Sequence, residues 1–192
     1  MQELKERIVK EGKVLPGSII KVDGFLNHRI DTELMDHIAE EFGKHFNMDE
    51  VTMILTAEAS GIALATAVAS RFHKPMIFAK KAKSDNIEGG LYQSDIYSYT
   101  YKKKVTLLVS KEWLSSDDKV LVIDDFMANG EAMRGLCDIV TAAGATLVGI
   151  GCAVEKGFQG GGDRLRAAGV NLKSLAIIES AEPGHIVFRD DD

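Results

Sequence analysis

The sequence has few residues that could tie a fold together through disulfides or a bound transition metal. Its 192 residues include two cysteines, Cys137 and Cys152, and both lie in apolar stretches. Such a pair is typical of reduced core residues rather than of a disulfide framework. The five histidines are scattered without the spacing of a zinc site. We therefore predict no metal held by protein nitrogen or sulfur, and we assign no metal-ligating residue.

Long apolar runs and an excess of positive charge are also missing. No run approaches the length that crosses a bilayer, and the first residues, Met1 to Arg7, lack the apolar segment of a secretory leader. The formal net charge of −6 argues against a surface that follows nucleic acid. We expect a cytoplasmic protein that binds neither membranes nor nucleic acid, and the length suits one domain over residues 1–192.

What the sequence does contain is a distinctive stretch from Lys119 to Ala132. Four apolar residues at 120–123, three of them β-branched, predict a fully buried strand. Two adjacent acids, Asp124 and Asp125, follow at once, and a short polar turn comes next. Apolar residues then recur at helical spacing through Met133, Leu136, Val140 and Ala143. The predicted order is strand, acidic turn, helix.

A tight turn between a strand and a helix is suited to binding an anion such as phosphate. Free backbone N–H groups and the positive end of the helix dipole point at whatever lies above the strand. Small side chains and Gly130 allow a close approach to the main chain. The two aspartates would repel that anion unless they face sugar hydroxyls or a Mg²⁺ shell. A ribose 5-phosphate meets both needs, although adjacent aspartates are also common turn formers and helix caps.

The whole stretch resembles the phosphoribosyl pyrophosphate (PRPP) motif of the type I phosphoribosyltransferases. Four apolar residues, two acids, two variable residues and a small-residue loop occur in the same order. In many members this loop is rich in Thr and Gly. Here residues 128–132 are Ala, Asn, Gly, Glu and Ala, which resembles the branch of the family that uses xanthine. The resemblance, which extends over nearly the whole chain, implies that Asp124 and Asp125 are catalytic and that the PRPP 5-phosphate binds at Ala128, Asn129, Gly130, Glu131 and Ala132.

A second strand, turn and helix precede the motif. Val51–Thr56 predicts a buried strand, and a small-residue turn at Glu58–Ile62 leads into a helix that ends near Phe72. Two such units favour an α/β fold with a parallel sheet and ligands at the carboxyl ends of its strands. The resemblance implies the type I phosphoribosyltransferase fold, with a mainly parallel twisted sheet flanked by helices. It further implies a hood from about 1–30 and 155–192 and a core of about 31–154.

Three segments outside this pattern carry further predictions. Residues 80–104 hold lysines, tyrosines and no convincing core stripe, which fits either a solvated loop or a flexible flap over a polyanion. Beside a phosphate site we favour the flap. Residues 155–162 are glycine-rich and predict a flexible loop, and residues 182–192 predict an acidic tail.

The resemblance also implies where a purine binds. The base contacts fall at Ile20, Asn27 and Lys156. Lys156 donates hydrogen bonds and accepts none, so it selects a carbonyl group over an amino group. Asn27 has a donor and an acceptor end and suits either the second carbonyl of xanthine or the amino group of guanine. Without the resemblance, Lys156 would be a surface lysine and Asn27 a turn former.

Together these features predict transfer of the 5-phosphoribosyl group from PRPP to xanthine. The resemblance implies Mg²⁺ bound mainly through PRPP, pyrophosphate and water, and it implies a homodimer. A guanine or hypoxanthine enzyme is the alternative within the class. A non-catalytic PRPP-sensing purine regulator is the alternative outside it, although the first fifty residues show no clear helix-turn-helix pattern. An aspartyl phosphatase is weaker, because Phe126 stands where that motif needs a second acid.

Overall fold

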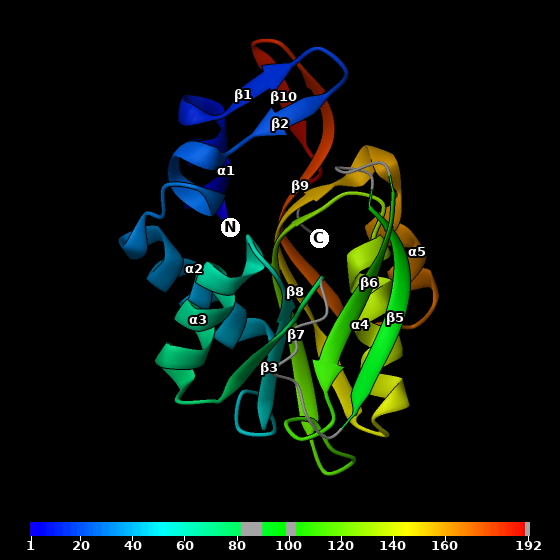
Figure 1. Cartoon of the computed structure of the whole chain (residues 1–192). Helices are drawn as coiled ribbons and strands as arrows, with labels where there is room; N and C mark the ends of the chain where they lie inside the picture. Colours follow the sequence, from blue (N-terminus) through cyan, green and yellow to red (C-terminus); the bar gives the residue numbers. More distant parts are fainter. Residues whose placement is uncertain (82–89, 99–102, 191–192) are drawn as a thin grey trace.

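A mainly parallel six-stranded sheet forms the centre of the molecule. The computed structural model describes residues 1–81, 90–98 and 103–190. The strand order is β10-β9-β8-β7-β3-β4, and only the β9–β10 pair is antiparallel. The strands are β3 (Met53–Ala57), β4 (Met76–Ala79), β7 (Lys119–Met127), β8 (Thr146–Lys156), β9 (Leu172–Glu182) and β10 (His185–Phe188). The predicted α/β fold with a mainly parallel sheet is confirmed (Figure 1).

Helices cover both faces of this sheet. Helices α2 (Thr32–His45) and α3 (Gly61–Phe72) pack on one face, and α4 (Glu131–Ala142) packs on the other (Figure 1). Each face has its own apolar cluster, because alternate side chains of a buried strand point to opposite sides. Leu121 and Ile123 of β7 belong to the first cluster, and Val120 and Val122 belong to the second. The motif strand is therefore buried on both faces, as its β-branched sequence predicts.

The N-terminal helix and hairpin pack against a C-terminal strand of the sheet (Figure 1). Helix α1 (Gln2–Glu11) is followed by the antiparallel hairpin of β1 (Lys13–Leu15) and β2 (Ile19–Lys21), and then by a π-helical turn at Asp23–Asn27. Leu4 and Ile8 of α1 share a cluster with Leu175 and Ile178 of β9. The prediction of an acidic tail from 182 is wrong for His185–Phe188, which pair with β9 as β10. The division into hood and core stays a prediction.

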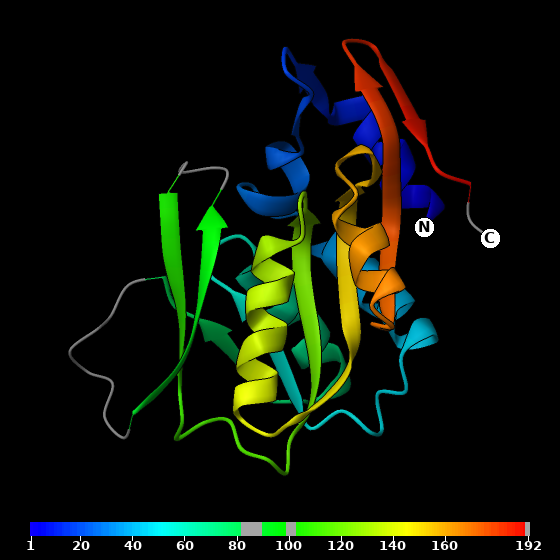
Figure 2. The ribbon, with the colours of Figure 1, turned by 90° about the vertical axis from the view of Figure 1, so that its right-hand side faces the viewer.

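The segment predicted to be a flap without buried residues contains an ordered strand. Strand β5 (Leu91–Ser98) pairs antiparallel with β6 (Lys103–Ser110), and the hairpin lies beside α4 (Figure 2). Ile96 is buried because Gly135 of α4 leaves room for it, and a Cβ there would lie 2.5 Å from the Ile96 side chain. The expectation that this segment has no buried residues is therefore wrong, while its role as a flap stays a prediction. The rest of the segment, at 82–89 and 99–102, lies outside the described residues.

The glycine-rich segment 155–162 is also more regular than predicted. Strand β8 continues through Lys156, a 3-10 turn covers Gly157–Gln159, and α5 (Gly161–Ala167) begins directly after Gly160. The glycines serve close packing. A Cβ on Gly162 would lie 2.1 Å from a carboxylate oxygen of Glu155, and one on Gly161 would lie 2.4 Å from the Ala128 carbonyl oxygen. The prediction of a flexible loop here is wrong.

Candidate active site

The acidic pair lies inside strand β7 rather than in a turn beyond it. Strand β7 continues to Met127, because its parallel pairing with β8 extends through Phe126↔Val154 and Met127↔Glu155. Asp124 and Asp125 are both buried. Neighbouring residues of a strand point to opposite faces, so the two carboxylates leave the strand in different directions. The prediction of an acidic turn is wrong in this respect, while the order of strand, small-residue loop and helix is confirmed.

Asp124 points beneath the start of helix α3. A Cβ on Gly61, the first residue of that helix, would lie 2.3 Å from Asp124 Oδ1. Only a glycine leaves room for the carboxylate at this point. Burial raises the pKa of Asp124 well above its usual value, and the nearby charge of Asp125 raises it further. The backbone N–H of Asp125 also donates to Asp124 Oδ1 at 3.0 Å.

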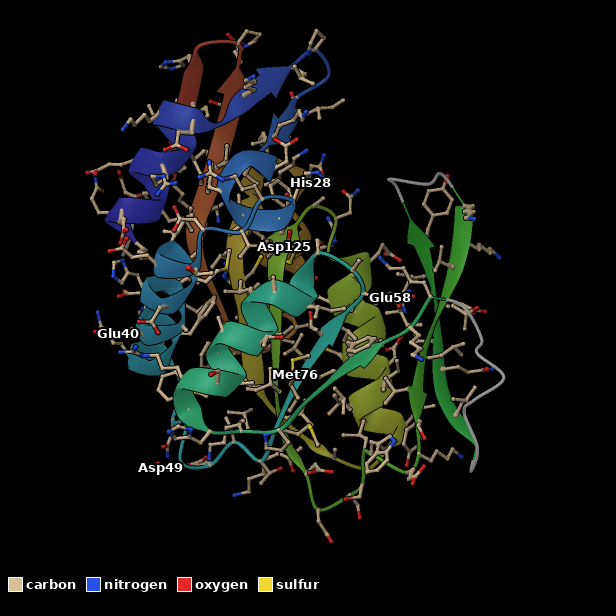
Figure 3. The ribbon with its side chains drawn as sticks, turned by 60° about the vertical axis from the view of Figure 1, so that its left-hand side comes forward. His28, Glu40, Asp49, Glu58, Met76 and Asp125 are labelled. Carbon is tan, nitrogen blue, oxygen red and sulfur yellow. The ribbon has the colours of Figure 1, made fainter. Side chains whose placement is uncertain are left out.

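Asp125 of β7 is hydrogen-bonded to side chains from two segments that lie far from it in the sequence. Ser60 Oγ donates to its Oδ1 at 2.8 Å, and Asn27 Nδ2 donates to its Oδ2 at 2.8 Å. Ser60 lies in the small-residue turn before α3, and Asn27 ends the π-helical turn. Figure 3 labels Asp125 and also Glu58 of the same small-residue turn. Both donors are neutral, so hydroxyl groups of a ligand can replace them without separating an ion pair.

The loop after β7 has the geometry of an anion site. Gly130 has a φ of +76°, a left-handed conformation that favours glycine, and α4 begins at the next residue. In the described part of the chain, no side chain caps this helix, and Arg134 N makes a helical bond to Gly130 O at 2.9 Å. The first backbone N–H groups of α4 therefore have no partner within the helix and are available to a ligand.

These features open into one cleft of about 190 Å³ at the carboxyl end of β7. Asp124, Asp125 and all five predicted phosphate-loop residues line it. Glu58 and Ser60 line it from the turn before α3, and Tyr97 lines it from β5. Lys81 supplies a positive charge, and its backbone N–H donates to Glu58 Oε1 at 2.6 Å. The sequence does not distinguish Lys81 from the other lysines of residues 80–104. Only the fold identifies it, among the described residues, as the lysine that lines this cleft.

The predicted base-contact residues lie beside this cleft rather than in it. Asn27 reaches it through Asp125. Lys156 ends β8, donates to the Ser18 carbonyl oxygen at 3.0 Å and lies 5.5 Å from the centre of the Phe126 ring. Burial lowers the pKa of Lys156. The Ile20 side chain, in contrast to those of Asn27 and Lys156, is buried in the apolar cluster that includes Leu4 and Ile8 of α1.

A metal ion has few protein ligands here. No group of three or more His, Cys, Asp or Glu side chains that could hold a metal is found across 1–81, 90–98 and 103–190. Within the same ranges, no helix is both long enough and apolar enough to span a membrane. The oxygen-rich cleft does offer Glu58 and Asp125 carboxylates, and Mg²⁺ commonly binds one or two carboxylates together with substrate phosphates and water.

Comparison with known proteins agrees with the geometry. The family model described as "Phosphoribosyl transferase domain" matches residues 25–170. A protein of Bifidobacterium animalis subsp. lactis, named xanthine phosphoribosyltransferase, is 53% identical over 98% of this chain and 100% of its own length. One of the same name from Lachnoclostridium phytofermentans is 51% identical over 100% of both chains.

Solved structures show the same fold at lower sequence identity. The adenine phosphoribosyltransferase of Giardia lamblia, solved with 9-deazaadenine, matches with a TM-score of 0.75 at 20% identity, over 90% of this chain and 96% of that one. The Trypanosoma brucei adenine enzyme matches with a TM-score of 0.73 at 22% identity, over 90% of this chain and 78% of that one. The chain belongs to the phosphoribosyl transferase domain family and has the type I phosphoribosyltransferase fold.

Proposed function

We propose that the protein transfers the 5-phosphoribosyl group of PRPP to xanthine, giving xanthosine 5′-monophosphate and pyrophosphate. The observation that carries the proposal is the single cleft in which the buried acids of β7 lie next to the uncapped start of α4. The relatives named xanthine phosphoribosyltransferase, about half identical over nearly their whole length, support xanthine as the base.

The reaction is a displacement at the anomeric carbon of the ribose. A ring nitrogen of the base forms the new C–N bond, the C–O bond to pyrophosphate breaks, and its electron pair leaves with the pyrophosphate. Positive charge builds on the ribose during this exchange. Asp125 is well placed to accept hydrogen bonds from the ribose hydroxyls in place of Ser60 and Asn27. The negative charge of Asp125 would stabilise the developing cation, and Asp124 lines the same cleft.

The phosphate groups of PRPP would bind at two turns. The 5-phosphate suits the loop of residues 128–132, where backbone N–H groups of α4 are available. The pyrophosphate suits the turn at Glu58–Ile62, next to Lys81. Mg²⁺ would be bound mainly by PRPP, pyrophosphate and water, with Glu58 or Asp125 as the protein oxygens that fit it. When bound, this ion neutralises charge on the leaving pyrophosphate.

The base would lie between Asn27 and Lys156. The amide of Asn27 is held next to the ribose-binding acid, so it would face the part of the purine near the sugar. Lys156 would exchange its bond to the Ser18 carbonyl for one to a carbonyl oxygen of the base. Because the Ile20 side chain is buried, its contact with the base would come from the main chain.

A cytoplasmic homodimer completes the proposal. The family resemblance and the proposed substrates support both points, and light scattering on the purified protein measures the oligomeric state directly. A monomer with full activity would remove the dimer from the proposal and leave the chemistry intact.

The deciding experiment is a substrate panel. Xanthine, guanine, hypoxanthine and adenine are each supplied with PRPP and magnesium, and pyrophosphate release is measured. We expect xanthine to give the highest kcat/KM and adenine to give none, because its amino group would leave Lys156 unpaired. A higher kcat/KM with guanine or hypoxanthine would reassign the base. No turnover with any base, together with tight and specific binding of duplex DNA, would support the regulator instead.

A Lys156→Ala variant in the same panel tests the account of base selection. It is expected to lose kcat/KM for xanthine by about tenfold or more, since a hydrogen bond to a charged donor is lost. Lys173→Ala, an exchange of the same type on β9, is the matched control. A Lys156→Ala variant that uses xanthine as well as the parent would contradict our account of selectivity.

A further inference from the structure

Helix α5 contacts the back of the predicted phosphate loop. Gly161 packs so closely that a Cβ there would lie 2.4 Å from Ala128 O, 2.6 Å from Asn129 C and 2.7 Å from Gly130 N. Arg164, three residues further along this short helix, donates from Nη2 to the Asn129 carbonyl oxygen at 3.1 Å. It also donates from Nη1 to Gln159 O at 3.4 Å. The guanidinium therefore links α5 to the main chain of the loop.

We propose that Arg164 is a positioning residue for the phosphate loop, an inference that rests on the proposed function. The Asn129 carbonyl and the Gly130 N–H belong to one planar trans peptide, so they point in opposite directions. Holding the oxygen toward Arg164 turns the Gly130 N–H away from that guanidinium, which leaves it for an anion in the cleft that Gly130 lines. The positive guanidinium also polarises this peptide, which strengthens its N–H as a donor to an anion.

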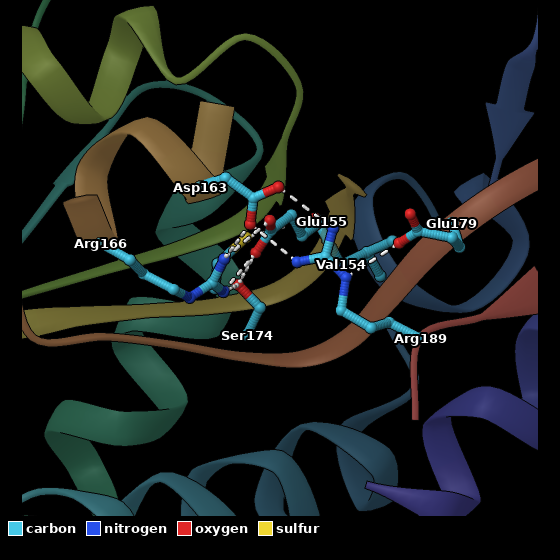
Figure 4. A network of polar contacts seen from close by, with 8 residues as sticks. Val154, Glu155, Asp163, Arg166, Ser174, Glu179 and Arg189 are labelled. Atoms are coloured by element: carbon cyan, nitrogen blue, oxygen red, sulfur yellow. Dashed lines mark hydrogen bonds and ion pairs between the residues drawn. The ribbon is translucent and has the colours of Figure 1, made fainter. Parts of the chain in front are cut away.

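The helix that carries Arg164 is itself firmly anchored. Arg166 Nη1 and Nη2 donate to the two oxygens of the buried Glu155 at 3.1 and 2.7 Å, and Ser174 Oγ donates to the same carboxylate (Figure 4). On its other side, Asp163 accepts from Arg189 at 2.7 and 3.1 Å. Consequently α5 is tied to β8, to β9 and to the residue after β10. A guanidinium on this helix has a defined position, although Arg164 itself is exposed.

Because Arg164 is exposed, its replacement tests the proposed positioning role with little effect on folding. Replacing it leaves no buried charge behind, so an Arg164→Ala variant is expected to fold as the parent does. Arg71→Ala is the matched control, because Arg71 is an arginine bound to Asp36 and Glu40 on the outside of α2 and α3. Arg164→Lys keeps the charge and one donor, so it should recover part of the lost affinity.

Steady-state kinetics with xanthine then separate positioning from general damage. We expect Arg164→Ala to raise the KM for PRPP about tenfold, with kcat and the KM for xanthine within about twofold of the parent. Calorimetry should show weaker binding of ribose 5-phosphate and unchanged binding of pyrophosphate, which lacks the 5-phosphate. An unchanged KM for PRPP and unchanged ribose 5-phosphate affinity would overturn the inference, as would an equal change in Arg71→Ala.

The two proposals fail in different ways. A parent protein that transfers no phosphoribosyl group to any purine would overturn the proposed function, and ribose 5-phosphate binding would still test Arg164. A parent that transfers the group while Arg164→Ala behaves like Arg71→Ala would overturn only the inference about α5.

Discussion

Strands β7 and β8 lie side by side, and both carry acidic side chains into the interior, but the surroundings of these acids differ. Glu155 of β8 is fully buried and meets a bidentate arginine and a serine hydroxyl. Asp125 of β7 is as deeply buried and meets two neutral donors, Ser60 and Asn27. The first acid is neutralised within the protein and holds elements together. The second is bound by neutral donors that a ligand can replace, and it opens on a cleft.

A similar contrast separates two neighbouring residues of β8. Glu155 and Lys156 are adjacent on β8, so they point to opposite sides of the strand. One side chain anchors α5, and the other lies beside Phe126 near the proposed base site. Burial of an acid therefore does not by itself indicate catalysis. The partner that faces it decides whether the group serves the fold or the ligand.

The strongest test of this contrast is on the β7 side. Asp125→Asn keeps the shape of the side chain but removes its charge and one acceptor, so it cannot serve the ribose hydroxyls in the same way. We expect turnover to fall by about 100- to 1,000-fold, the range seen when a group that stabilises transition-state charge is removed. Circular dichroism and the thermal midpoint should stay near those of the parent. Near-normal turnover of both Asp125→Asn and Asp124→Asn would refute the assignment.

The next test is on the β8 side, where stability should change. Arg166→Met would leave the Glu155 carboxylate buried without a counterion, which typically costs about 3 kcal/mol or more. Urea unfolding measures the free energy directly. The double variant Glu155→Met with Arg166→Met should recover most of the loss, because the unpaired charge is gone. A loss below about 1 kcal/mol in the single variant would show that Glu155 does not need its partner.

The smallest expected effect concerns the pH dependence contributed by Asp124. Its pKa is raised in the folded state by burial and by Asp125, whereas the unfolded chain titrates near its ordinary value of about 3.9. Above that value the unfolded state loses its proton first, so rising pH lowers the stability of the folded parent. Asp124→Asn removes this penalty.

At about pH 3 we expect Asp124→Asn and the parent to have the same free energy of unfolding. As the pH rises toward neutrality, the free energy of unfolding of the variant should increase relative to that of the parent. Denaturant titrations at several pH values measure the difference. An advantage that is constant with pH, or that shrinks as the pH rises, would contradict a raised pKa. Asp138→Asn, which alters an exposed acid on α4, is the control.

Much of this molecule follows from local sequence. The β-branched run before Asp124, the small residues after Asp125 and the helical spacing from Met133 predict a buried strand, an anion loop and a helix, because side-chain periodicity and backbone freedom act over a few residues. The start of α2 also follows local chemistry, since Asp31 at its N-cap accepts from the Leu34 N–H. The parallel order of the units follows in turn from the alternation of strands and helices.

Tertiary structure decided how these units were completed. Ser60 and Asn27 lie 65 and 98 residues from Asp125, and Arg164 lies 35 residues from Asn129. No local period connects positions so far apart, and only the packing of the strands brings them within hydrogen-bonding distance. For the same reason the glycine-rich segment 155–162 suggested a flexible loop, although close contacts with Ala128 and Glu155 require Gly161 and Gly162. The sequence by itself specified the acids and the loop. The fold supplied their partners, and these partners distinguish the acid that holds elements together from the acids that line the cleft.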